Sequence, residues 1–186
     1  DSGTVYFPAQ NGTNGYELWK SDGTESGTTM VKDIRSGSSS SDTSNYYLWN
    51  DKIYFEATDG TNGKELWVSD GTESGTTLLK DIYSGSSSSQ PQKFTEFNSS
   101  LYFSAGDGTN GTELWKTDGT ESGTTLVKDI RSGTSSSSPS SFVVVGSELF
   151  FTADDGTNGE ELWKTDGTES GTTLLKDIYS GSTSSD

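Results

Sequence analysis

The stretch Glu17-Leu18-Trp19-Lys20-Ser21-Asp22-Gly23-Thr24 has a counterpart in each of three later parts of the chain. It returns as ELWVSDGT from Glu65 and as ELWKTDGT from Glu113 and Glu161, so each copy begins 48 residues after the previous one. A fixed interval of this length is typical of a protein built from repeated structural units. The chain is therefore interpreted as a single repeat domain of four repeats, approximately residues 1–42, 43–90, 91–138 and 139–186.

Each repeat contains short apolar segments separated by turns. In the second repeat these segments are residues 46–49, 53–55, 65–67 and 78–82, and β-branched and aromatic residues predominate in them. Asp-Gly and Asn-Gly clusters between such segments predict hairpins, and no window shows helical periodicity. Four antiparallel strands in a unit of this length predict one blade of a β-propeller, in which small sheets stack against each other. The expected fold is all-β, a propeller of four 48-residue, four-stranded blades.

One blade is expected to be one strand short. Residues 1–42 contain counterparts of three of the four segments and lack the variable one, which is residues 46–49 in the second repeat. An incomplete sheet presents an edge to which another strand can add. We therefore expect a neighbouring subunit in a homo-oligomer, or further chain, to complete it. The four blades then form a closed ring, half of an eight-bladed ring, or a segment of a longer array.

Composition limits the classes of partner. The chain has 28 acidic and 12 basic residues, a net charge of −16, and neither histidine nor cysteine. Such an acidic surface disfavours nucleic acid and anionic lipid. No apolar run reaches the length of a membrane span, so membrane insertion is not expected. The absence of histidine excludes a Ser-His-Asp catalytic site.

The repeated motif supplies two sets of residues for which structural roles are expected. The tryptophans of the motif are predicted to pack between blades, and its aspartates are predicted to shape the hairpin that follows. The packing residues are Trp19, Trp67, Trp115 and Trp163, and the turn residues are Asp22, Asp70, Asp118 and Asp166. The Ser-rich links between repeats are expected to be flexible.

A second set of polar residues is a candidate metal site. Each of the last three repeats places Asp, Asn and Glu on one Gly-rich turn and the strand after it, and such oxygen ligands suit Ca²⁺. The candidates are Asp59, Asn62 and Glu65; Asp107, Asn110 and Glu113; and Asp155, Asn158 and Glu161. In the first repeat Asn11 replaces the Asp. The alternative is that Asp and Asn bond to the turn backbone. No cofactor is certain, and Ca²⁺ is the candidate.

The repeat also resembles a known family. The pattern E-L-W-x-x-D-G-T, preceded by D-G-T-N-G and followed by G-T-T-L-V-K-D-I, resembles the ELWxxDGT repeat of bacterial secreted and surface proteins. The resemblance covers all four repeats. It implies a β-propeller located outside the cell or on its surface, and it implies no catalytic activity.

The leading functional hypothesis is a non-enzymatic, extracellular structural or adhesive module that assembles by sharing strands between subunits. The alternative is a lectin-like or Ca²⁺-dependent propeller that binds glycans. A glycan-acting hydrolase is a distant third hypothesis, because the repeated carboxylates form no singular constellation that differs from one repeat to the next.

Overall fold

The computed structural model describes residues 3–181, and every regular element in that range is a β-strand. The chain divides into two compact units between Gln90 and Pro91, which is the predicted boundary between the second and third repeats. Each unit contains two consecutive repeats. Whether the two units form the single domain expected from the sequence stays a prediction. Within the described range no helix is long and apolar enough to cross a membrane.

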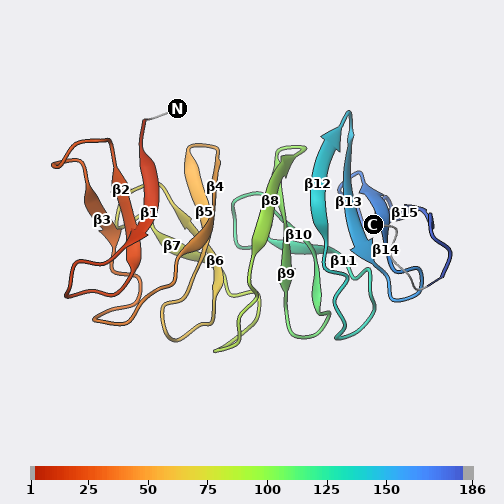
Figure 1. The fold of residues 1–186 in the computed structure, drawn as a ribbon, viewed down its shortest axis with the longest axis horizontal. Helices are drawn as coiled ribbons and strands as arrows, with labels where there is room; N and C mark the ends of the chain where they lie inside the picture. Colours follow the sequence, from red (N-terminus) through yellow and green to blue (C-terminus); the bar gives the residue numbers. More distant parts are fainter. Residues whose placement is uncertain (1–2, 182–186) are drawn as a thin grey trace. The chain divides into compact units, whose positions relative to one another are not determined.

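The first unit contains two antiparallel sheets (Figure 1). The first sheet has the order β1 (Val5–Ala9), β2 (Glu17–Ser21), β3 (Thr29–Lys32). The second has the order β4 (Ser44–Trp49), β5 (Lys52–Ala57), β6 (Glu65–Ser69), β7 (Thr77–Lys80). The first sheet is thus one strand shorter than the second, as the sequence predicts.

The second unit contains two sheets of four strands each (Figure 1). One consists of β8 (Gln92–Phe97), β9 (Ser100–Gly106), β10 (Thr112–Thr117) and β11 (Thr125–Lys128). The other consists of β12 (Ser140–Val145), β13 (Glu148–Asp154), β14 (Glu160–Thr165) and β15 (Thr173–Lys176). The edge strands β8 and β12 contact each other, so the two sheets approach at this side. Each sheet follows the simple up-and-down order expected of a blade.

The hairpins follow from local turn chemistry. Asn50 and Asp51 join β4 to β5 with φ angles of 50° and 59°, the left-handed conformation that a two-residue hairpin turn needs and that Asn and Asp tolerate well. A bulge interrupts the pairing of β4 with β5 between Ser44 and Tyr47, where Asn45 also has a positive φ. The bulges in β8 and β12 lie at the same place, so each of these three variable strands begins with a kink.

The third segment of each repeat is shorter than expected. The sequence predicts a strand through Ile34 and its equivalents, but β3 ends at Lys32. The reason is that the Ile34 amide donates its hydrogen to the carboxylate of Glu17 (2.8 Å) and not to a neighbouring strand. Equivalent bonds from Ile82, Ile130 and Ile178 act on the other repeats.

Each unit has one apolar core between its two sheets. In the first unit Val31 and Ile34 from the first sheet pack in one cluster with Phe55 and Trp67 from the second. In the second unit Val127 and Ile130 pack in the same way with Phe151 and Trp163. The tryptophan of one blade therefore covers the β-branched residues of the blade before it. Burying such side chains contributes about 1.5–3 kcal/mol each, so this stacking stabilises each unit.

Candidate functional site

The Asp-Gly-Thr turn that follows each motif strand is closed by its aspartate. Asp70 Oδ1 accepts hydrogen bonds from the Thr72 amide (2.9 Å) and hydroxyl (2.7 Å), and that hydroxyl in turn accepts from the Gly75 amide (3.0 Å). A side chain at Gly75 would collide with the Asp70 carboxylate. Hydrogen bonds from Thr72 lower the pKa of Asp70. The same bonds recur at Asp22, Asp118 and Asp166.

The Gly-rich turn before each motif strand is organised in a similar way. Asp59 Oδ1 accepts from the amides of Thr61 and Asn62, each at 2.8 Å, and Asp59 Oδ2 accepts from Asn62 Nδ2 at 2.9 Å. Burial raises the pKa of Asp59, but these hydrogen bonds outweigh it and lower the pKa overall. Asp107 with Asn110 and Asp155 with Asn158 repeat the arrangement. In the first repeat Asn11 accepts the same backbone bonds and contacts Asn14.

The motif glutamate has a different task, which the sequence did not reveal. Glu65 is fully buried, and its carboxylate accepts hydrogen bonds from the Ile82 amide (2.7 Å), the Ser89 amide (2.9 Å) and the Ser89 hydroxyl (2.6 Å). Glu65 thereby joins the segment just after β7 to the end of the Ser-rich link. Glu113 does the same with Ile130 and Ser137. The sequence signal is a serine 24 residues after the glutamate, which all four repeats contain.

We call the hydrogen bonds that the motif glutamate accepts from this serine and from the isoleucine amide the glutamate clamp. The clamp contradicts the expectation that the Ser-rich links are flexible. The serine that contacts the glutamate is almost completely buried in three repeats, with exposures of 0% at Ser41, 2% at Ser89 and 1% at Ser137. A buried carboxylate needs hydrogen-bond donors, and the backbone of the link supplies them. The links are therefore anchored at this end.

Burial strongly affects the ionisation of the clamp. It raises the pKa of Glu113 from 4.5 to about 7, against the lowering effect of hydrogen bonds from Ser137 and Ile130. Burial likewise raises the pKa of Glu17 and Glu65. A carboxyl group with a raised pKa is a general-acid candidate in an enzyme. Glu113, however, is completely shielded from solvent, so no substrate reaches it in this conformation.

The structure does not assemble the predicted calcium ligands. Asp59 and Asn62 bond to each other at the turn, whereas Glu65 is directed to Ile82 and Ser89. Among residues 3–181 no group of three or more acidic side chains is placed so that it could hold a metal ion. Calcium binding therefore stays a sequence prediction that this geometry does not strengthen.

The motif tryptophans differ in burial. Trp67, Trp115 and Trp163 are only 5–6% exposed, and Trp67 and Trp163 belong to the two cores described above. Trp19 is only partly buried. It lies in the first sheet, and the stacking seen in each unit places the tryptophan against the preceding blade. The first blade of the chain therefore leaves its tryptophan face less covered.

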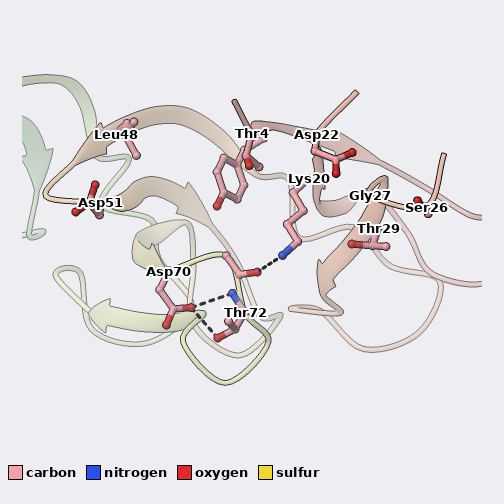
Figure 2. Close-up of a pocket in the computed structure, with 12 residues that line it drawn as sticks. Thr4, Lys20, Asp22, Ser26, Gly27, Thr29, Leu48, Asp51, Asp70 and Thr72 are labelled. Atoms are coloured by element: carbon pink, nitrogen blue, oxygen red, sulfur yellow. Dashed lines mark hydrogen bonds between the residues drawn. The ribbon is translucent and has the colours of Figure 1, made fainter. Parts of the chain in front are cut away.

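A cavity of about 600 Å³ lies between the two sheets of the first unit (Figure 2). Its walls include Thr4 and Tyr6 of the first repeat and Leu48 and Asp51 of the second. At its base Lys20 Nζ donates to the carbonyl of Gly71 at 2.8 Å, which ties the two sheets together. Burial, followed by the negative charge of Asp70, raises the pKa of Tyr6, so its phenol stays neutral. Neither Tyr6 nor Lys20 is among the site residues predicted from the sequence.

Comparisons with known proteins concern the fold alone. No family model and no curated protein sequence matches this chain. A crystal structure of puromycin hydrolase is 17% identical over 95% of this chain and 28% of its own, with a TM-score of 0.55. A structure from an analysis of two prolyl endopeptidases is 13% identical over 92% of this chain and 26% of its own, with a TM-score of 0.50.

The computationally designed Ika8 protein is also similar, with 19% identity and a TM-score of 0.49 over 99% of this chain and 49% of that one. This chain thus spans between about a quarter and a half of these structures. Such low identities carry no information about activity. The puromycin hydrolase and prolyl endopeptidase structures agree with the all-β architecture of antiparallel, blade-like sheets.

Proposed function

We propose that this chain is a non-enzymatic structural module that assembles with further copies into a β-propeller ring. The proposal rests on apolar residues that are exposed in the fourth repeat. Leu175 and Ile178 are 48% and 58% exposed, whereas their equivalents in the third repeat, Val127 and Ile130, are 5% and 7% exposed. Apolar side chains that are exposed where their equivalents are buried indicate an interaction surface.

The partner for these residues is defined by the packing inside each unit. Val127 and Ile130 lie in one core with Trp163 of the following blade, and Val31 and Ile34 lie in one core with Trp67. By the same stacking, Leu175 and Ile178 accept the tryptophan face of another blade. Trp19 is the partly buried tryptophan of the chain's motif and suits this role. One copy's fourth repeat then packs on the next copy's first repeat, a head-to-tail contact that closes a ring or extends an array.

The internal chemistry supports a structural role. The repeated aspartates bond to turn backbone, and the repeated glutamates clamp buried amides. These aspartates and glutamates thus shape the blades in which they lie. The resemblance of the octamer to bacterial secreted and surface proteins supports placing the module outside the cell or on its surface, where an adhesive role is the corresponding proposal.

Mass in solution tests the assembly. Light scattering after size-exclusion chromatography is expected to give a multiple of the 19.9 kDa chain mass. Ile178→Asp places a charge in the proposed interface and should return the protein to monomers. Val143→Asp is the matched control, because Val143 is similarly exposed (56%) but lies on β12. A monomeric parent protein, or an Ile178→Asp variant that assembles as the parent does, would overturn the proposal.

A glycan-binding function is the second candidate, favoured by a polar cavity of about 450 Å³ in the first unit. Its walls include Arg35, Asn62, Lys64 and Gln90, which offer both donors and acceptors for hydroxyl groups. A glycan array probed with the parent protein and with Asn62→Ala tests it. Signals that are lost in Asn62→Ala would favour this second function, and an array without signals would exclude the glycans printed on it.

A further inference from the structure

The cavity beside Tyr6 differs from the matching place in two other repeats. In the second repeat Trp49, the last residue of β4, lies against Tyr54 with ring centroids 5.4 Å apart. In the third repeat Phe97, the last residue of β8, lies against Tyr102 at 5.5 Å. Tyr6 is the equivalent tyrosine of the first repeat, and the sheet order places no described strand on that side of β1.

Burial reflects this difference. Tyr54 and Tyr102 are each 2% exposed, and Trp49 and Phe97 are each 3% exposed. Tyr6 is only partly buried and lines the cavity together with Thr4. In each of these aromatic pairs both rings are therefore shielded from water. The Tyr6 side chain, by contrast, is open to the cavity on one side.

The register of the complete sheets shows what fits there. Trp49 is opposite Lys52, and Tyr47 is opposite Tyr54, across the β4–β5 pair. Thr4 and Tyr6 correspond to Lys52 and Tyr54 at the 48-residue interval. A strand added to β1 in the same register therefore brings its last residue opposite Thr4, at the wall of the cavity. Cross-strand and diagonal neighbours at these spacings are in contact when one of them is a large aromatic ring.

Pro8 makes the aromatic contact more important. It stands on β1 where the other repeats have Glu56, Ser104 or Thr152, and these residues pair with the variable strand. Proline has no amide hydrogen and is confined to edge strands in sheets. A strand added to β1 consequently forms a shorter ladder of hydrogen bonds near Pro8. The end of the strand at Thr4 and Tyr6 must then supply more of the binding free energy.

From these observations we infer that the first unit carries a binding site for an extended peptide strand with an aromatic residue at its C-terminal end. The strand adds to the edge of β1 that no described strand pairs with, and its aromatic ring enters the cavity between Thr4, Tyr6 and Leu48. The cavity wall carries three aspartates, Asp22, Asp51 and Asp70, against one lysine, so it selects against acidic residues at this end of the peptide. This inference goes beyond the proposed ring assembly and does not depend on the exposed residues of the fourth repeat.

A synthetic peptide of the second repeat, DTSNYYLWN (residues 42–50), is the probe. Isothermal titration calorimetry with the full chain is expected to show one site. A peptide in which the Trp49 position is alanine should bind at least about tenfold more weakly, as truncation of a buried aromatic anchor does. Equal binding of both peptides would overturn the aromatic site, and no binding of the first peptide would overturn the strand site altogether.

Two variants of the protein locate the site. Tyr6→Ala should weaken peptide binding by about tenfold or more. Tyr102→Ala is the matched control, since Phe97 already covers that tyrosine, and it should leave peptide affinity unchanged. Circular dichroism verifies that both variants are folded. An equal loss in both variants would show that the effect is on folding and would contradict the site.

A third variant gives a gain of binding. Pro8→Ser introduces the residue that the third repeat has at this position, Ser104, and restores an amide hydrogen on β1. Peptide affinity should rise severalfold if the strand adds along β1, and it should stay unchanged if the peptide binds elsewhere. Because Ile178→Asp removes the proposed ring contact, the titration repeated in that variant separates the two proposals: peptide binding persists there if only the ring proposal fails.

Discussion

The two units of this chain share a contact between their sheets and differ in how an equivalent tyrosine is covered. Lys20 Nζ bonds to the Gly71 carbonyl in the first unit, and Lys116 Nζ bonds to the Gly167 carbonyl in the second, both at 2.8 Å. Tyr102, however, is covered by Phe97, whereas Tyr6 borders a cavity. Similar repeat sequences therefore reproduce this contact between blades. The burial of a given residue depends in addition on whether a neighbouring strand covers it.

The largest difference is expected for the two tyrosines. Tyr102→Ala should lower the free energy of unfolding by about 3–5 kcal/mol, because a fully buried aromatic ring is lost. Tyr6→Ala should lower it by only about 1–2 kcal/mol, since the ring is partly exposed and the cavity already borders it. Urea denaturation followed by tryptophan fluorescence measures both. Equal losses would mean that the cavity is closed in solution and would contradict the difference in burial between Tyr6 and Tyr102.

The buried glutamate clamp predicts a dependence of stability on pH. The unfolded chain releases the proton of Glu113 above about pH 4.5, whereas the folded chain keeps it up to about pH 7. The folded state binds more protons in this window, so the free energy of unfolding should fall as pH rises from 4.5 to 7, on the order of 2 kcal/mol. Below pH 4.5 this contribution is fully present.

Urea titrations at several pH values measure that dependence, and Glu113→Gln is the matched variant because its side chain does not titrate. The variant should show a shallower slope between pH 4.5 and 7. Its remaining slope reflects Glu17 and Glu65, whose pKa values are also raised. A slope of the same size in the parent and the variant would contradict the assignment to Glu113.

The lysine contacts between sheets should behave alike in both units. Lys20→Met and Lys116→Met each remove a charged hydrogen bond to a backbone carbonyl and keep much of the apolar stem. We expect each to lower the free energy of unfolding by about 1 kcal/mol. Hydrogen-exchange mass spectrometry can report the loss separately for residues up to 90 and beyond. A clear difference between the two variants would show that the shared contacts are not equivalent.

The smallest effect is expected for an ion pair found in one unit. Arg131 Nη1 contacts Asp154 Oδ2 at 2.5 Å, and both side chains are about one-third exposed. Its equivalent Arg35 instead donates to the Ser40 carbonyl at 3.3 Å. Arg131→Ala should cost less than about 1 kcal/mol, and 0.5 M NaCl should reduce the cost further. Arg35→Ala is the control and should show a weaker dependence on salt, as measured by thermal denaturation.

Much of the architecture was predictable from spacing alone. The 48-residue interval predicts most of the strands and a sheet that is one strand short, and the structure contains both. These features depend on local alternation and turn residues, which a sequence displays directly. The predicted end of β3 was wrong by two residues. The reason is that the Ile34 amide donates to the carboxylate of Glu17, which lies 17 residues away in the sequence.

The strands, the turns and the repeated Asp and Asn that close the turns can be read from short stretches of the sequence. What each repeat buries depends on its tertiary contacts. The structure shows that Glu65 clamps Ser89, that Ile178 is exposed where Ile130 is covered, and that Tyr6 borders a cavity where Tyr102 meets Phe97. The physical reason is that turn geometry is a property of a few consecutive residues, whereas burial is set by neighbours on other strands. Repeats with nearly the same sequence therefore acquire different surfaces at the two ends of the chain.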